Sequence, residues 1–228
     1  MAAPGASEMV VVVTGGDPID RDHALDLPTD ATVIAVDSGV EHAQDLGLAI
    51  HLAVGDFDSV DPDRLAQAER AGATVERHPA AKDATDLELA LDAALALGPS
   101  HIHVLGGHGG RLDHLLGNGL VLAAPAYAGA TVTARMGTAR LAVVRGSVEL
   151  SGPHGDLVSL LPVHGGAQGV TTSGLLYPLA GEDLHPGSTR GISNELIGGA
   201  ATVRVDHGVL LAIQPGSLGT HHLQEPNR

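Results

Sequence analysis

The sequence has no cysteine, no tryptophan and a single lysine, and only 1% of its residues are aromatic. The absence of cysteine excludes disulfides, thiolate zinc sites and a cysteine nucleophile. It also gives no reason to expect an oxidising compartment, so we predict a cytoplasmic location. Because rings are so scarce, the hydrophobic core must be built from Val, Leu, Ile and Ala, and this alphabet suits tightly packed α/β structure.

Positive charge is also scarce, since the formal net charge is −15 and Lys82 is the only lysine. Proteins that bind nucleic acids neutralise many phosphates with Lys and Arg, so we expect no nucleic-acid partner. An anionic ligand would need help from a metal ion. The first residues lack a basic stretch and their apolar run is too short to span a bilayer, so we expect neither a signal peptide nor a membrane partner.

The 228 residues divide into two parts with different patterns. The first part alternates short apolar runs with helical periodicity, which is typical of a mostly parallel sheet with flanking helices. From about residue 136 the pattern changes to short alternating runs separated by Gly and Pro, which predicts an all-β sandwich or barrel. We therefore predict an α/β domain over residues 1–136 and an all-β domain over residues 137–228.

Apolar runs predict the strands, and helical periodicity predicts the helices between them. The helices are expected at residues 61–71, 85–97 and about 111–126. The strands of the first part are expected at residues 9–13, 32–36, 52–54, 74–77, 101–105 and 131–134. Those of the second part are expected at residues 139–144, 147–150, 157–162, 167–171, 201–205 and 209–213. In open α/β sheets ligands bind beyond the carboxyl ends of the strands, so the loops there are the candidate site.

The clearest of these loops is Gly-Asp-Phe-Asp-Ser at residues 55–59, directly after an apolar run. In an extended chain residues two apart share a face, so Asp56 and Asp58 could bind one cation while Phe57 packs the other way. Carboxylate oxygens suit Mg²⁺, which completes its shell with water and substrate phosphates. A polar turn that caps a helix beginning near Asp61 explains the same residues about as well.

A second motif, Lys-Asp-Ala-Thr-Asp at residues 82–86, lies where a strand leads into a helix. The N-terminus of a helix offers free N–H groups and the positive end of its dipole to an anion, and Lys82 adds a positive charge. Thr85 as the helix cap and Asp86 in the first turn are also expected for helix stability alone. The position of the single lysine favours the functional interpretation.

A third motif, Gly-Gly-His-Gly-Gly-Arg-Leu-Asp-His, occupies residues 106–114. Its glycines allow the backbone to approach a ligand closely, and Arg111 has the donor geometry for phosphate oxygens. Asp113 adds another carboxylate at a helix start. A flexible turn capped by Asp113 is an equally good local explanation.

Two further loops belong to the same predicted edge of the sheet. Gly15 and Gly16 follow the first strand and Asp37 follows the second, although neither loop has dinucleotide-binding or P-loop spacing. Together the five loops would form one acidic crevice, where like charges coexist only around a cation. His101 and His103 share one face of a predicted strand, and we assign them no role in function.

Taken as a set, the motifs at 55–59, 82–86 and 109–114 resemble those of the thiamine pyrophosphokinase family. The similarity continues through GLLYPL at 174–179 and GISN at 191–194, so it covers nearly the whole chain. It implies a Rossmann-like nucleotide-binding domain, a C-terminal β-sandwich that binds thiamine and mediates dimerisation, and a homodimer with thiamine bound between subunits. The implied reaction converts ATP and thiamine into AMP and thiamine diphosphate with Mg²⁺ as cofactor.

The resemblance also implies roles for individual residues. The catalytic acidic residues would be Asp56, Asp58, Asp86 and Asp113. Of these, Asp56, Asp58 and Asp113 would hold Mg²⁺, and Asp86 would orient the thiamine hydroxyl or take its proton. The residues expected near thiamine are Tyr177, Ser193 and Asn194. The residues expected to bind ATP or its phosphates are Gly15, Gly16, Asp37, Lys82, Asp83, Thr85, Arg111 and His114.

The chain departs from the family pattern at two positions and leaves other functions open. Ser38 stands where glycine is usual, and Tyr177 stands where tryptophan is frequent and offers a smaller flat face to a ring. A diphosphokinase for a hydroxymethyl-pterin and a metal-dependent phosphohydrolase fit part of the pattern. A nucleotide or metal sensor with a degenerate site is the non-enzymatic alternative. Tyr177 and residues 191–194 favour thiamine, and three intact acidic motifs favour an enzyme.

Overall fold

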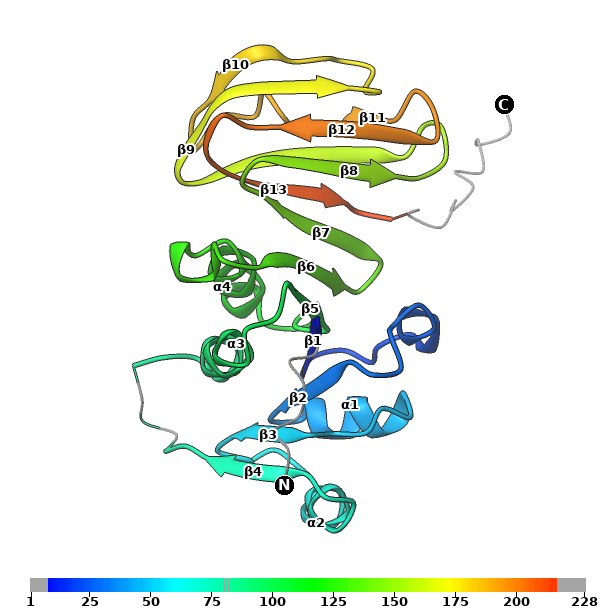
Figure 1. Cartoon of the computed structure of the whole chain (residues 1–228), viewed down its shortest axis with the longest axis vertical. Coiled ribbons are helices and arrows are strands. Elements are labelled where there is room, and N and C mark those ends of the chain that lie inside the picture. The colour runs from blue at the N-terminus through cyan, green and yellow to red at the C-terminus, as the bar shows by residue number, and fades with distance from the viewer. Residues whose placement is uncertain (1–7, 80, 82, 217–228) are drawn as a thin grey trace, which may run out of the picture. The chain divides into compact units, whose positions relative to one another are not determined.

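The computed structural model describes residues 8–79, 81 and 83–216, so Lys82 lies outside the described residues. The chain is a mixed α/β protein with a large β-sheet and few helices, as the sequence predicts at this coarse level. It divides into two compact units (Figure 1). Unit 1 comprises Met1–Gly137 with Leu141–Val143, and unit 2 comprises Thr138–Arg140 with Val144–Arg228.

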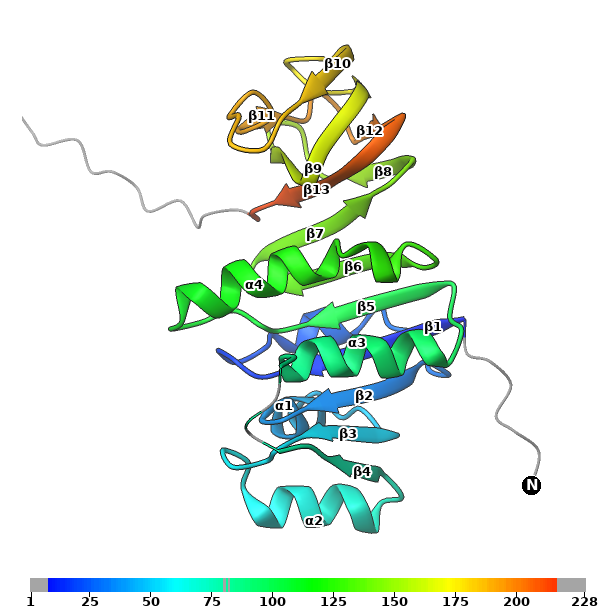
Figure 2. The same cartoon turned by 90° about the vertical axis from the view of Figure 1, so that its left-hand side faces the viewer.

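Unit 1 contains a parallel sheet, and Figure 2 shows its strands side by side. The strands are β1 (Met9–Thr14), β2 (Thr32–Val36), β3 (Leu52–Gly55), β4 (Thr74–Arg77), β5 (His101–Leu105) and β6 (Thr131–Met136). Their order is β4-β3-β2-β1-β5-β6, and each neighbouring pair is parallel. The chain leaves β1 toward β2 but leaves β5 toward β6. The carboxyl ends of β1 and β5 therefore form a topological switch point, where open α/β sheets bind their ligands.

Helices cover both faces of this sheet, with α1 and α2 on one face and α3 and α4 on the other (Figure 1). The α-helices are α1 (Gly39–Asp45), α2 (Pro62–Arg70), α3 (Asp86–Ala96) and α4 (Leu112–Leu122). Two short 3₁₀ helices are η1 (Arg21–Ala24) and η2 (Pro125–Tyr127). The four valines of β1 are fully buried, as expected for a central strand covered on both sides. No helix within the described ranges is long and apolar enough to cross a membrane.

The helix starts follow from local hydrogen bonding. The Asp61 carboxylate accepts from the Asp63 N–H at 2.9 Å, and Pro62 takes the first helical position of α2. The Thr85 hydroxyl accepts from the Glu88 N–H at 3.2 Å and so caps α3, as the sequence predicts. Helix α1 was not expected from the sequence, because it has only seven residues and no side-chain cap at its start.

Unit 2 consists of β-strands within its described residues. Strand β7 (Ala139–Val144) has residues in both units, and unit 2 adds β8 (Ser147–Ser151), β9 (Leu157–Ser173), β10 (Ala180–Leu184), β11 (Asn194–Glu195), β12 (Ala200–Arg204) and β13 (His207–Gln214). Strand β9 pairs antiparallel with β10, β11, β12 and β13. The prediction of two strands at 157–162 and 167–171 was wrong, because β9 runs through both. Its residues 164–166 have positive φ, so the glycines there bend the strand without ending it.

Candidate active site

A cavity of about 520 Å³ lies in unit 1 at the carboxyl ends of β1 and β5. The loops after β1, β2 and β5 and the first turns of α3 and α4 supply its walls. This is the position that the sheet topology favours for a ligand. Six of the residues that the sequence singled out line it, namely Gly15, Asp37, Thr85, Asp86, Arg111 and His114.

Close packing between the loops explains the glycines after β1. A Cβ atom on Gly15 would lie 2.2 Å from the Ser38 hydroxyl oxygen. Gly16 has a φ of 125°, and a Cβ there would lie 2.1 Å from the carbonyl oxygen of His108. The same His108 carbonyl accepts from the Asp17 N–H at 2.8 Å, which ties the β1 loop to the β5 loop. Side chains are therefore excluded where the two loops meet.

Three carboxylates, from the loops after β2 and β3 and from the first residue of α3, come together beside the cavity. Burial raises the pKa of Asp37 to about 6, a hydrogen bond from the Phe57 N–H opposes this rise, and the carboxylates of Asp86 and Asp56 add to it. The Phe57 N–H lies 3.2 Å from Asp37 Oδ1, so the loop after β3 is fastened to the loop after β2. Asp86 also hydrogen bonds with Asp37 through its side chain. This part of the predicted acidic crevice is present.

Two other acidic residues, Asp58 and Asp113, are not among the groups that shift the pKa of Asp37. Asp58 is exposed, and its N–H donates to Asp56 Oδ1 at 3.1 Å. Asp113 is paired with Arg111, whose Nη2 and Nε lie 2.6 Å and 3.3 Å from its carboxylate oxygens. The hydrogen bond from Arg111 lowers the pKa of Asp113 to about 2. Across the described residues, no three His, Asp or Glu side chains are grouped so as to hold a metal ion.

Other predicted residues have local roles or lie beside the cavity. Thr85 uses its hydroxyl to cap α3 as well as lining the cavity. Asp83 and Gly16 are exposed and do not line it. Lys82 lies outside the described residues, so its predicted contact with phosphate stays a prediction.

The cavity also contains residues to which the sequence analysis gave no role of their own, among them Asn118 and, within the quoted motifs, His108 and Ser59. Asn118 Nδ2 donates to the Gly107 carbonyl at 2.9 Å and holds the glycine-rich loop against α4. One signal was available, since Asn118 follows His114 by four residues and so shares its helix face. His108 Nδ1 is buried without a hydrogen-bond partner in the described part of the chain. No sequence pattern distinguished His108 from a turn residue.

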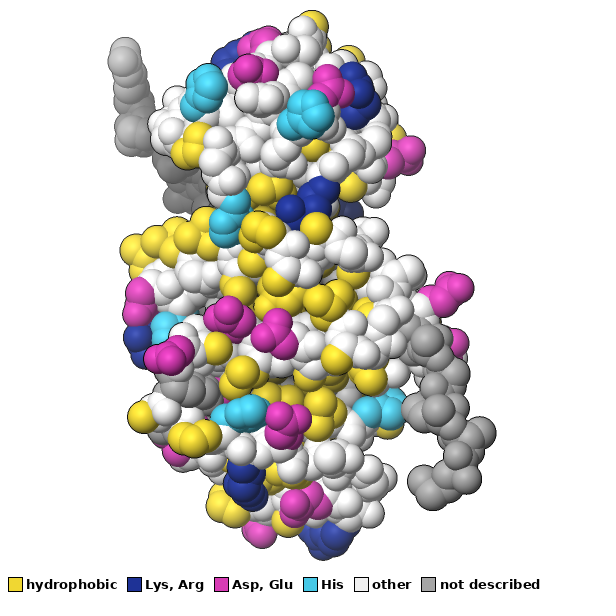
Figure 3. Space-filling view, turned by 60° about the vertical axis from the view of Figure 1, so that its left-hand side comes forward, with side chains coloured by type: hydrophobic (Ala, Val, Ile, Leu, Met, Phe, Trp, Pro, Cys, Tyr) yellow, Lys and Arg dark blue, Asp and Glu magenta, His cyan; other side chains and the backbone are white. Residues whose placement is uncertain are grey.

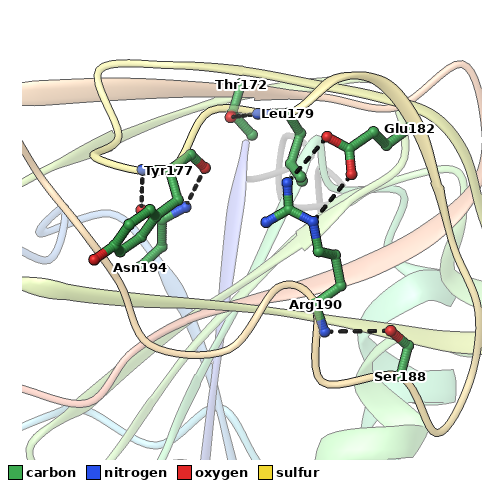
Figure 4. A network of polar contacts seen from close by, with 7 residues as sticks. All are labelled: Thr172, Tyr177, Leu179, Glu182, Ser188, Arg190 and Asn194. Carbon is green, nitrogen blue, oxygen red and sulfur yellow. Dashed lines mark hydrogen bonds and ion pairs between the residues drawn. The ribbon is translucent and has the colours of Figure 1, made fainter.

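The residues predicted to lie near thiamine are in unit 2, where Asn194 and Tyr177 contact each other (Figure 4). The Tyr177 N–H donates to Asn194 Oδ1 at 2.9 Å, and Asn194 Nδ2 donates to the Tyr177 carbonyl at 2.7 Å. The Tyr177 side chain is 56% exposed. Ser193 has a φ of 56°, and its N–H donates to Ser159 Oγ at 3.1 Å. Tyr177 therefore lies on a loop that contacts Asn194, the first residue of β11, and Ser193 directly precedes that strand.

Two family models match this chain. Residues 27–134 match the family described as "Thiamin pyrophosphokinase, catalytic domain", and residues 147–210 match "Thiamin pyrophosphokinase, vitamin B1 binding domain". The chain is 33% identical to the thiamine pyrophosphokinase of Bacillus subtilis over 190 residues, which are 79% of this chain and 86% of the relative.

Solved structures are similar over most of the chain. The crystal structure of the Bacillus subtilis thiamine pyrophosphokinase superposes with a TM-score of 0.80 at 30% identity, covering 92% of this chain and 100% of that one. The thiamin pyrophosphokinase of Geobacillus thermodenitrificans gives a TM-score of 0.77 at 30% identity, covering 92% and 99% of the two chains.

Proposed function

This chain belongs to the thiamine pyrophosphokinase family, and we propose that the acidic cavity of unit 1 is where it transfers the diphosphate group of ATP to thiamine. The chain is a thiamine diphosphokinase, and the products of its reaction are thiamine diphosphate and AMP. The observation that carries the site assignment is the cavity at the switch point, which brings Asp37, Asp86 and Arg111 together. A site with carboxylates and a guanidinium suits a metal-bound polyphosphate.

We propose that Asp56, Asp58 and Asp113 hold Mg²⁺ against the polyphosphate. The chemistry of the donors fits this ion, because carboxylate oxygens are its preferred protein ligands. Burial is the main cause of the raised pKa of Asp37, and the negative charges of Asp86 and Asp56 add to it, so a nearby divalent cation would offset those charges. When bound, Mg²⁺ would neutralise charge on the phosphates. Asp113 is now paired with Arg111, so this ligand set requires that pair to open.

The remaining residues of the cavity position the reactants. Arg111 would donate to phosphate oxygens, together with Lys82, and the backbone of Gly15, Gly16, Asp83 and Thr85 would border the nucleotide with Asp37 and His114. Asp86 would orient the thiamine hydroxyl for attack on the β-phosphorus of ATP, or accept its proton. Little covalent chemistry falls to the protein in such a transfer, so positioning and charge neutralisation supply most of the rate.

We propose that Tyr177, Ser193 and Asn194 form the thiamine site. They lie within residues 147–210, which match the vitamin B1 binding domain. The flat face of Tyr177 suits a cationic or aromatic ring, and its exposure leaves that face accessible. In the same proposal, residues 1–136 are a Rossmann-like catalytic domain, and residues 137–228 are a β-sandwich for thiamine binding and dimerisation.

A homodimer is part of the proposal, and exposed leucines support it. Leu112, Leu116 and Leu120 of α4 are 68%, 59% and 49% exposed and lie at successive four-residue steps along the helix. Figure 3 shows hydrophobic side chains at the surface on this side of the molecule. Apolar patches of this kind commonly mark contact surfaces. A cytoplasmic location stays a prediction from the absence of cysteine.

Product analysis tests the reaction and separates the alternatives. The protein is incubated with ATP and Mg²⁺, with thiamine, with a hydroxymethyl-pterin or with no acceptor. We expect AMP and thiamine diphosphate in equal amounts only when thiamine is present. AMP release with the pterin alone would indicate the other diphosphokinase, and phosphate release without an acceptor would indicate a phosphohydrolase. ATP binding without turnover would indicate a sensor.

A further inference from the structure

The loop at residues 174–179 in unit 2 is fixed by main-chain hydrogen bonds at both ends. The Leu176 N–H donates to the Glu195 carbonyl at 2.9 Å. At the other end, the Thr172 N–H donates to the Leu179 carbonyl at 2.9 Å, and the Leu179 N–H donates to Thr172 Oγ1 at 2.9 Å (Figure 4). A loop bonded in this way has little backbone freedom.

The side chains at the centre of this loop are apolar and exposed. Leu176 is 45% exposed and Tyr177 is 56% exposed, and Ile197 on the neighbouring segment is 53% exposed. A rigid backbone that presents a flat ring to solvent loses little entropy when a ligand covers that ring. The loop is therefore already arranged for binding before a ligand arrives.

The side chain that fixes Tyr177 is Asn194, which is only 6% exposed. Its Oδ1 accepts from the N–H groups of Tyr177 and Glu195, both at 2.9 Å. Its Nδ2 donates to the Tyr177 carbonyl at 2.7 Å. An amide oxygen has two lone pairs and an amide nitrogen has two hydrogens, so both acceptor positions and one donor position are already used.

We propose that Asn194 is a positioning residue, which acts on thiamine through Tyr177 and does not itself bind the substrate. This inference rests on the proposed thiamine site and changes the role that the family resemblance implies for Asn194. The Asn194 amide holds both main-chain groups of Tyr177, its N–H and its carbonyl, and among the described residues no other side chain bonds to both.

Four proteins test the inference, namely the unchanged chain, Asn194→Ala, Tyr177→Ala and the double variant. We expect Asn194→Ala to raise the thiamine KM about tenfold with the ATP KM unchanged, as the loss of about 1.4 kcal/mol of binding would do. Tyr177→Ala should raise the thiamine KM at least as much. The double variant should be no worse than Tyr177→Ala alone, because the two residues act through one contact.

If the thiamine KM of the double variant rises by the product of the two single effects, Asn194 contacts thiamine directly and the inference is overturned. An unchanged thiamine KM in Asn194→Ala would overturn it as well. If the unchanged chain makes no thiamine diphosphate, the assigned reaction fails instead, and the two failures are thus distinguishable. The matched control is Gln214→Ala, which removes another buried amide of unit 2, bonded to the Ser151 carbonyl at 3.0 Å and outside this loop. It should leave the thiamine KM unchanged.

A spectroscopic measurement tests the same point without turnover. The chain has two tyrosines, Tyr127 and Tyr177, and no tryptophan, so Tyr127→Phe leaves Tyr177 as the main intrinsic fluorophore. In that background Asn194→Ala should lower the fluorescence anisotropy of Tyr177, because the loop gains motion. Asn194→Ser is the milder replacement if Asn194→Ala does not fold. Unchanged anisotropy in a folded variant would contradict the positioning role.

Discussion

At the scale of single residues, the environment of each acidic side chain separates residues that look alike in the sequence. Asp37 has a raised pKa because it is partly buried and lies beside Asp86 and Asp56. Asp113 has a lowered pKa because Arg111 donates to it. Asp58 is exposed, so we expect its side chain to contribute to metal binding and not to the stability of the fold.

Replacement of Asp58 tests the metal assignment. We expect Asp58→Asn to lower kcat by about a hundredfold or more, because an amide is a weaker ligand for Mg²⁺ and charge neutralisation dominates this chemistry. The melting temperature should not change, since the side chain is exposed. Asp63→Asn, also exposed and in α2, is the matched control and should keep full turnover. Near-normal kcat in Asp58→Asn would contradict the assignment.

His103 should make the stability of the protein depend on pH. Burial lowers its pKa from 6.5 to about 4, and His103 Nδ1 lies 2.7 Å from Thr133 Oγ1. Because the pKa of His103 is lowered in the folded state, neutral His103 contributes its full stabilisation above pH 6.5. This contribution is lost as the pH falls toward 4. At pH 5 the loss relative to neutral pH should be on the order of 2 kcal/mol.

The measurement compares the unchanged chain with His103→Gln, which cannot titrate. Between pH 7.5 and pH 5, the unfolding free energy of the unchanged chain should fall by about 2 kcal/mol more than that of His103→Gln. A difference that stays constant over this range would show that His103 titrates normally. The comparison cancels the remaining histidines, which are the same in both proteins.

At the scale of elements, close backbone contacts decide which residues can begin a helix. Gly39 is the first residue of α1, and a Cβ atom there would lie 2.1 Å from the Val13 carbonyl oxygen. Helix α1 therefore lies against the end of β1 only because residue 39 has no side chain. This contact is invisible in the periodicity of the sequence.

Gly39→Ala should accordingly destabilise the protein by about 2 kcal/mol or more, because either the helix or the strand must shift. Gly129→Ala is the matched control, since a Cβ there would meet nothing within 4 Å. Chemical denaturation of both variants measures the difference. Equal stability of the two variants would mean that α1 can move away from β1 without cost.

Local sequence predicted the elements of unit 1 better than those of unit 2. The expected strands at 32–36, 74–77 and 101–105 coincide with β2, β4 and β5. Strand β2 is a buried apolar run, as expected inside a parallel sheet, whereas β4 ends the strand order and is mostly exposed. The long strand β9, with its pairing partners β10 and β11, was not predicted. Its course depends on glycines that bend a strand and on pairing between distant segments, which no local pattern contains.

The candidate site was predictable in part for the same reason. Gly15, Asp37, Asp86 and Arg111 could be identified because each follows a strand or begins a helix at the predicted edge of the sheet. The pairing of Asp113 with Arg111 could not be predicted, because it depends on the rotamers that the two side chains adopt. His108 was also missed, because only the packing of its loop against the β1 loop brings it to the cavity.

At the scale of the whole molecule, the apolar side chains of α4 predict self-association. Leu116→Asp combined with Leu120→Asp should convert a dimer into a monomer in light scattering, because buried charges at a contact surface are costly. Leu25→Asp is the matched control, since Leu25 is 76% exposed and lies outside α4. A dimer that survives both substitutions in α4 would place the contact surface elsewhere.

The central claim is that two phosphoryl groups leave ATP as one unit and that AMP is the leaving group. The most direct measurement follows radioactive phosphorus from ATP labelled at the α or the γ position, with thiamine and Mg²⁺ present. We expect the γ label to appear in thiamine diphosphate and the α label to appear only in AMP. Thiamine monophosphate carrying the γ label, with ADP carrying the α label, would contradict it.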